Sequence, residues 1–256
     1  MKKILFLFFC IILLSCGGSD IESEIQSGIS ENDSLVYEKT YSIIGNSIST
    51  YNGYIPGDYA TYYPKVWFKG VDDTWWMIIG RLLNLHFLSN ASWSASTVSG
   101  NKQSCFTSDI RLKHLSASGI PEIIFIAGGT NDWVAGVSLG EENDELNYNT
   151  STFRGAYALM LNKLKTMYPK TEVVCLGIFP RSDGFDTPNK KGWTVREANH
   201  FIDLLAQKNE YRYIDMELCG IADDFKKYTH DGLHPTYEGM KLIANHIQKK
   251  YLLLSN

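Results

Sequence analysis

The sequence predicts an α/β fold of three layers, in which helices cover both faces of a mostly parallel five-stranded sheet. First, short runs rich in β-branched and aromatic residues alternate with longer segments that carry apolar residues at helical spacing. Second, several of these runs end in glycine, serine or asparagine, as strands do where they lead into the binding crevice of an open sheet. The 256 residues are enough to bury the core of one such domain.

The strands and helices are expected in alternation along the chain. Strands are predicted over residues 41–44, 85–89, 122–127, 172–179 and 211–214. Helices are predicted over residues 74–83, 110–115, 152–168, 194–208 and 236–250. Asp72 or Asp73 is expected to cap the first helix, and Ser151 the third. The polar segment 133–150 is expected to be a loop.

The first residues predict a processing signal that is separate from the domain. Lys2 and Lys3 precede an apolar run that is too short to span a bilayer, and the run leads into Leu-Leu-Ser-Cys. This pattern resembles a bacterial lipoprotein signal, in which Cys16 becomes the acylated first residue after cleavage. The alternative is a plain secretory signal with an incidental cysteine.

The resemblance to lipoproteins divides the chain into three parts. Residues 1–15 are then the signal peptide, residues 16–36 a polar and acidic flexible tether, and residues 37–256 the folded domain. The expected location is the cell envelope, on the bacterial outer membrane or cell surface, with the membrane reached through a lipid on Cys16.

The charge of the mature chain argues against one class of partner. After residue 15 there are 22 Lys and Arg against 28 Asp and Glu, which gives a net charge of −6. Nucleic-acid binding needs clustered basic residues, and the sequence has no such cluster. A disulfide between Cys105 and Cys219 and the oligomeric state are left open.

The end of the first predicted strand carries a candidate nucleophile. Ser47 follows a buried run and Gly45, so it should stand at the carboxyl edge of the sheet. The backbone amides of such a turn can point at the same space as the serine hydroxyl. The alternative is that Ser47 only caps a helix.

Three further segments place polar groups at the same edge. They are the turn Ser94-Ala95-Ser96, Asn131, and the stretch Asp231-Gly232-Leu233-His234-Pro235. The spacing of Asp231 and His234 lets the carboxylate reach one imidazole nitrogen while the other nitrogen points away, as a catalytic base requires.

Together these segments resemble the SGNH (GDSL-type) hydrolases, α/β enzymes that cleave esters. The family's motifs have counterparts in the family's order: Gly-Asp-Ser at 45–47, Asn-x-Ser-x-Ser-Gly at 90–96, Gly-x-Asn-Asp at 129–132 and Asp-x-x-His-Pro at 231–235. The resemblance implies a flavodoxin-like sheet, Ser47 as nucleophile, His234 as general base and Asp231 as the group that orients it. It also implies an oxyanion hole made by the backbone amides of Ser47 and Ala95 and the side chain of Asn131.

The chain departs from the family pattern at two positions. Asn46 stands where aspartate is usual, and its amide can still accept hydrogen bonds that hold the turn. Ala95 stands where the oxyanion glycine is usual, and alanine tolerates a positive φ poorly.

A metal site is the rival interpretation of two histidines. His230 and His234 are four residues apart, like metal ligands on a helix, but Gly232 and Pro235 disfavour a helix there. We therefore expect neither a metal nor a cofactor.

The expected function is that of a serine esterase which works through an acyl-enzyme and deacetylates O-acylated carbohydrate at the cell envelope. Tyrosines in the long irregular loop 51–73 could line a sugar-binding rim or pack into the core. Two alternatives remain: a lysophospholipase or thioesterase, and a non-catalytic glycan-binding lipoprotein on the same fold.

Overall fold

The computed structural model describes residues 38–66 and 68–254. The predicted signal peptide, the predicted acylation site Cys16 and the predicted tether lie outside these residues. Among the helices described, none is long and apolar enough to cross a membrane.

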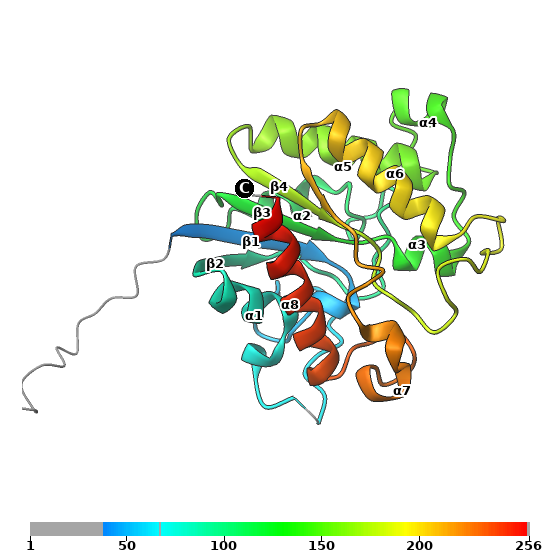
Figure 1. The fold of residues 1–256 in the computed structure, drawn as a ribbon. Helices are drawn as coiled ribbons and strands as arrows, with labels where there is room; N and C mark the ends of the chain where they lie inside the picture. The colour runs from blue at the N-terminus through cyan, green and yellow to red at the C-terminus, as the bar shows by residue number, and fades with distance from the viewer. Residues whose placement is uncertain (1–37, 67, 255–256) are drawn as a thin grey trace, which may run out of the picture. The chain divides into compact units, whose positions relative to one another are not determined.

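A five-stranded sheet forms the centre of the domain, as predicted (Figure 1). Its order is β2-β1-β3-β4-β5 and every neighbouring pair is parallel. The strands are β1 (Lys39–Gly45), β2 (Leu85–Asn90), β3 (Ile123–Ala127), β4 (Glu172–Leu176) and β5 (Arg212–Ile214). This order is the flavodoxin-like one, with its switch point between β1 and β3.

The fourth strand is shorter than the sequence predicts. Its apolar run continues to Phe179, but the backbone amide of Ile178 bonds the side chain of Asn199 at 2.8 Å instead of a neighbouring strand. Ile178 and Phe179 are nevertheless buried. The apolar pattern therefore predicted the burial of these residues correctly, but it placed the end of the strand too late.

All five predicted helices are present, with ends that differ by three residues at most. They are α1 (Trp75–Leu82), α2 (Asp109–His114), α5 (Phe153–Met167), α6 (Val195–Lys208) and α8 (Tyr237–Leu253). The structure also has short helices that the sequence did not predict: α3 (Thr130–Ala135), α4 (Glu142–Leu146), α7 (Phe225–Tyr228), and the 3₁₀ turns η1 (Ser47–Ser49), η2 (Val71–Asp73) and η3 (Ile221–Asp223). The expected loop 133–150 thus contains the end of α3 and all of α4.

Two of the expected helix caps are wrong. The residue at the start of α1 is Thr74, because Asp73 is used one turn earlier, where it accepts the amide of Lys69 at 2.6 Å. The cap of α5 is Thr152, whose hydroxyl accepts from Gly155, whereas the amide of Ser151 is held by Asn149.

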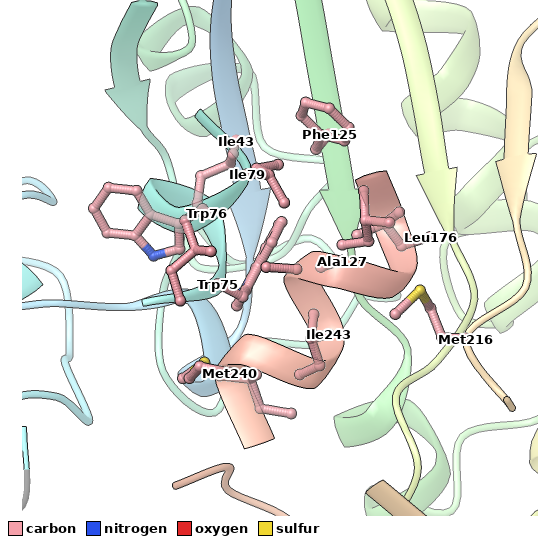
Figure 2. Packing of buried hydrophobic residues seen from close by; sticks show 14 of the residues in the cluster. Ile43, Trp75, Trp76, Ile79, Phe125, Ala127, Leu176, Met216, Met240 and Ile243 are labelled. Carbon is pink, nitrogen blue, oxygen red and sulfur yellow. The ribbon is translucent and has the colours of Figure 1, made fainter. Parts of the chain in front are cut away.

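Helices cover the two faces of the sheet, which gives the predicted three layers. The face of Ile43 and Phe125 packs against α1 and α8 (Figure 2). The opposite face packs against α2, α5 and α6. Alternation along β1 and β3 sends successive side chains to opposite layers, so both faces are apolar.

The helix α8 follows directly after the Asp231–Pro235 segment. Met240 and Ile243 of α8 lie against Trp75 of α1 in the same buried cluster (Figure 2). This packing fixes where α8 begins, and so it fixes where the preceding catalytic candidates stand.

The cysteines of the described domain are free and buried. Cys105 and Cys219 do not form a disulfide. Burial in β4 raises the pKa of Cys175 to about 12, so this thiol behaves as a small apolar group.

Candidate active site

The turn after β1 presents Ser47. Asn46 caps η1, and its side-chain oxygen accepts the amide of Ile48 at 3.1 Å. The expectation that asparagine can hold this turn is therefore confirmed. The alternative that Ser47 is the helix cap is wrong, because Asn46 has that position. The Ser47 carbonyl accepts from the Thr50 hydroxyl at 3.0 Å, which closes the turn.

Gly45 is needed for space in this turn. A Cβ at this position would lie 2.4 Å from the Ser49 hydroxyl and 3.0 Å from that of Ser92. Gly45 also accepts the backbone amide of Trp93 at 3.0 Å. Its small size lets the segment after β2 approach the nucleophile turn.

The Asp231–His234 segment forms a compact loop just before α8. One carboxylate oxygen of Asp231 accepts the backbone amides of Leu233 at 3.1 Å and His234 at 2.8 Å. Gly232 has φ +82°, a conformation that glycine adopts without strain. Its carbonyl accepts the amide of Ser182 at 2.7 Å, which ties this loop to the one after β4.

Ser47, His234 and Asp231 form one hydrogen-bonded chain. The Nε2 atom of His234 lies 2.8 Å from Ser47 Oγ, and its Nδ1 atom lies 2.7 Å from Asp231 Oδ2. Burial opposes ionisation of Asp231, but the hydrogen bonds from His234 outweigh it and lower the pKa of the carboxyl group. Asp231 is therefore a carboxylate at neutral pH, placed to hold the imidazole and to stabilise its protonated form.

The three predicted oxyanion donors come from neighbouring segments. Asn131 is the second residue of α3, and its side-chain nitrogen donates to the Ser96 carbonyl at 2.8 Å. That nitrogen has two hydrogens, so one remains for a substrate oxygen. Within the described residues, the backbone amides of Ser47 and Ala95 donate no hydrogen bond. All three groups therefore keep a hydrogen that is not bonded within the protein, as the predicted oxyanion hole requires.

Ala95 does adopt the unfavourable conformation. Its φ is +59°, and its side chain is exposed. Alanine in the left-handed region is strained by ~1–2 kcal/mol. Because Ala95 is exposed, its methyl group fills no space in the core.

We expect Ala95→Gly to change kcat/KM for a simple ester by about threefold or less, because the proposed donor is a backbone amide that both residues have. The relief of strain is partly offset by the greater freedom of glycine in the unfolded chain, so the melting temperature should change little. Steady-state kinetics and a thermal melt measure the two effects. A large loss of activity would mean that the alanine methyl group itself shapes the site.

Arg111 is an important site residue that sequence reasoning missed. It is fully buried in α2, and its guanidinium donates to the carbonyls of Gly45 at 2.7 Å, Ala91 at 2.8 and 2.9 Å, and Ser104 at 2.6 Å. Burial lowers its pKa to about 9, so it stays charged at neutral pH. One cation thus joins the end of β1 to the segment that leads to Ala95.

Asp132 connects α3 to the segment that follows Ala95. Its buried carboxylate accepts the amides of Val98 at 2.8 Å and Ser99 at 2.9 Å, and the Ser99 hydroxyl at 2.6 Å. Burial raises the pKa of Asp132 to about 6 despite these bonds. Because Asn131 is its neighbour, this anchor also fixes the start of α3 beside the Ser96 carbonyl.

The tyrosine-rich loop packs onto the site. Tyr63 is fully buried and its hydroxyl donates to the Pro235 carbonyl at 2.8 Å. Tyr59 is buried and stacks on Trp93, with 4.0 Å between the ring centroids. For these two tyrosines the core interpretation is right. Tyr62 stacks on the imidazole of His234.

The rival metal interpretation finds no support in the geometry. Both ring nitrogens of His234 are engaged, by Ser47 and Asp231. In the part of the chain that is described, no three His, Cys, Asp or Glu side chains gather as metal ligands do.

The sequence profile of a family described as GDSL-like lipase/acylhydrolase matches residues 39–180. This range includes Ser47, Ala95 and Asn131, and it ends before Asp231 and His234. No curated protein matches the chain.

Solved structures share the fold. A protein of Bacteroides ovatus described as a GDSL-like lipase is 26% identical, with a TM-score of 0.62 over 85% of this chain and 99% of its own. A second, from Bacteroides uniformis with the same description, is 24% identical, with a TM-score of 0.61 over 83% and 94%. A protein of Lactobacillus plantarum is 21% identical, with a TM-score of 0.65 over 84% and 97%.

Proposed function

Because this chain belongs to the GDSL-like lipase/acylhydrolase family and is an ester hydrolase, we propose that it works through an acyl-enzyme on Ser47 and removes acetyl groups from O-acetylated carbohydrate. The observation that carries the proposed chemistry is the hydrogen-bonded chain from Ser47 through His234 to Asp231. We further propose that a lipid on Cys16 holds the enzyme at the cell envelope.

The geometry supports a two-step reaction. Ser47 Oγ attacks the ester carbonyl while its proton passes to His234 Nε2, and the Asp231 carboxylate stabilises the imidazolium. The amides of Ser47 and Ala95 and the side chain of Asn131 bind the oxyanion of the tetrahedral intermediate. His234 then protonates the leaving alcohol. In the second step a water molecule, deprotonated by His234, attacks the acyl-enzyme, which releases the acid and restores Ser47.

The surroundings of Ser47 favour a small acyl group. Ser47, Asn131 and His234 line none of five surface cavities of the described domain that have volumes of about 270 to 470 Å³. A fatty acyl chain needs a continuous apolar pocket, because each buried CH₂ contributes ~0.8 kcal/mol. An acetyl group needs no such pocket.

The loop after β4 supports a polar substrate. It contacts the catalytic loop through the bond between Ser182 and Gly232. Next to that bond, the Arg181 guanidinium lies 4.2 Å from the ring centroid of Trp133 and pairs with Asp183. Charged side chains such as Arg181 and Asp183 can bind the hydroxyls of a sugar.

The test is a series of p-nitrophenyl esters from acetyl to octanoyl, together with acetylated oligosaccharides. We expect kcat/KM to be highest for the acetyl ester and to fall with chain length, and we expect acetate release from at least one glycan. Ser47→Ala is the matched blank for both assays.

The outcomes separate the alternatives. A kcat/KM that rises towards octanoyl would favour a lysophospholipase or thioesterase. Glycan binding without hydrolysis of any ester would favour a non-catalytic binding protein.

A further inference from the structure

One aromatic ring covers the imidazole of His234. The Tyr62 ring lies 3.7 Å from the His234 ring, centroid to centroid, and the two planes differ by 8°. This is a parallel stack at van der Waals contact. It restricts rotation of the imidazole about its χ2 angle, the motion that would break the bonds to Ser47 and Asp231.

The opposite face of Tyr62 is also occupied. The Lys65 ammonium lies 4.2 Å from the Tyr62 centroid. Two groups at these distances cannot share one face, so Lys65 and His234 lie on opposite sides of the ring. Tyr62 is therefore unavailable as a flat platform for a sugar.

The charge of Asp231 also acts on the Tyr62 hydroxyl. Burial raises the pKa of this phenol, and so does the negative charge of Asp231. One side chain thus stacks on His234 and feels the charge of Asp231.

The backbone of Tyr62 is tied to the nucleophile turn. Its amide donates to the Thr50 hydroxyl at 2.9 Å, and that hydroxyl donates to the Ser47 carbonyl at 3.0 Å. The next residue, Tyr63, is anchored to the segment of His234, because its hydroxyl donates to the Pro235 carbonyl at 2.8 Å. The ring is therefore held rigidly between the segment of Ser47 and the segment of His234.

We propose that Tyr62 is a positioning residue for this esterase: its stacked ring fixes the plane of the His234 imidazole. This inference rests on the esterase function proposed above. It predicts an effect on the chemical step, because Tyr62 orients the base and has no free face for substrate.

The experiment compares three variants on p-nitrophenyl acetate, with rates normalised by active-site titration with an organophosphonate. Tyr62→Leu keeps apolar bulk without a planar ring and should lower kcat roughly 10- to 100-fold with little change in KM. Tyr62→Phe keeps the stack and should retain kcat within about fivefold. The matched control is Tyr54→Leu, since Tyr54 lies in the same loop, is 41% exposed and contacts Tyr51 and Trp76. It should behave as the wild type.

A second readout does not depend on turnover. In the ligand-free protein, the proton between His234 Nδ1 and Asp231 should give a far-downfield ¹H resonance that is absent in His234→Ala. We expect this signal to be weakened by water exchange in Tyr62→Leu and kept in Tyr62→Phe.

Each result has a defined meaning. If Tyr62→Leu kept both its kcat and the downfield resonance, the inference about Tyr62 would be wrong. The proposed esterase function would still stand if the wild-type activity depended on Ser47. A raised KM at constant kcat would overturn it in favour of substrate binding by Tyr62. If the wild type hydrolysed no ester but Tyr62→Leu still lost the resonance, the positioning role of Tyr62 would be supported and the esterase proposal would be refuted.

Discussion

Replacing Ser47 by alanine is expected to lower kcat for a good ester by about 10⁴- to 10⁶-fold. The Ser47 hydroxyl supplies the proposed nucleophile, and its hydrogen bond to His234 Nε2 is 2.8 Å long. The substitution removes one oxygen atom and no core contact, so the melting temperature should stay within a few degrees of the wild type.

His234→Ala is expected to cause a loss of similar size, and the double variant should be scarcely worse than either single one. Groups that act as a unit give such non-additive losses. The measurement is kcat on p-nitrophenyl acetate, with circular dichroism to confirm folding. Retention of more than a few per cent of activity by Ser47→Ala would show that another group is the nucleophile.

Asp231→Asn is expected to lower kcat by about 10³- to 10⁴-fold. The Asp231 carboxylate accepts the Nδ1 proton of His234 through Oδ2, and an amide nitrogen in that place would favour the wrong tautomer. The other oxygen accepts the amides of Leu233 and His234, and the asparagine oxygen can keep these bonds. The loop should therefore keep its shape while the imidazole loses its orientation.

The matched control for this change is Asp203→Asn, which alters a carboxylate on α6 that accepts a hydrogen bond from the Gln207 side chain. It should leave kcat unchanged. If Asp231→Asn kept more than about a tenth of the wild-type activity, the carboxylate would not be what selects the tautomer.

The strands and long helices were predictable because each shows its period over enough residues. The missed helices are short. The helix α4 has five residues and rests on a capping box between Glu141 and Asp144, which a polar sequence does not distinguish from a loop. The end of β4 depends on the contact between Ile178 and Asn199, which lie 21 residues apart. No local pattern contains that contact.

The candidate triad was predictable because Asp231 and His234 are close in sequence and Ser47 follows a clear strand. The residues that support the site, such as Arg111 and Tyr62, could not be predicted from the sequence. Arg111 lies in a helix with charged neighbours, where a solvated side chain is the ordinary expectation. Its burial is possible only because the carbonyls of Gly45, Ala91 and Ser104 converge on it from distant segments. Tyr62 likewise stacks on a ring that is 172 residues further along the chain.

The sequence distance across the triad has a consequence for biosynthesis. The bond between Ser47 and His234 joins residues that are 187 positions apart. Synthesis proceeds from the amino terminus, so the proposed nucleophile and oxyanion donors emerge long before the proposed base. The base then comes into place with α8, whose packing against α1 completes one face of the core. An unfinished chain therefore lacks the proposed general base, and we expect hydrolytic activity only after the last layer of the fold has closed.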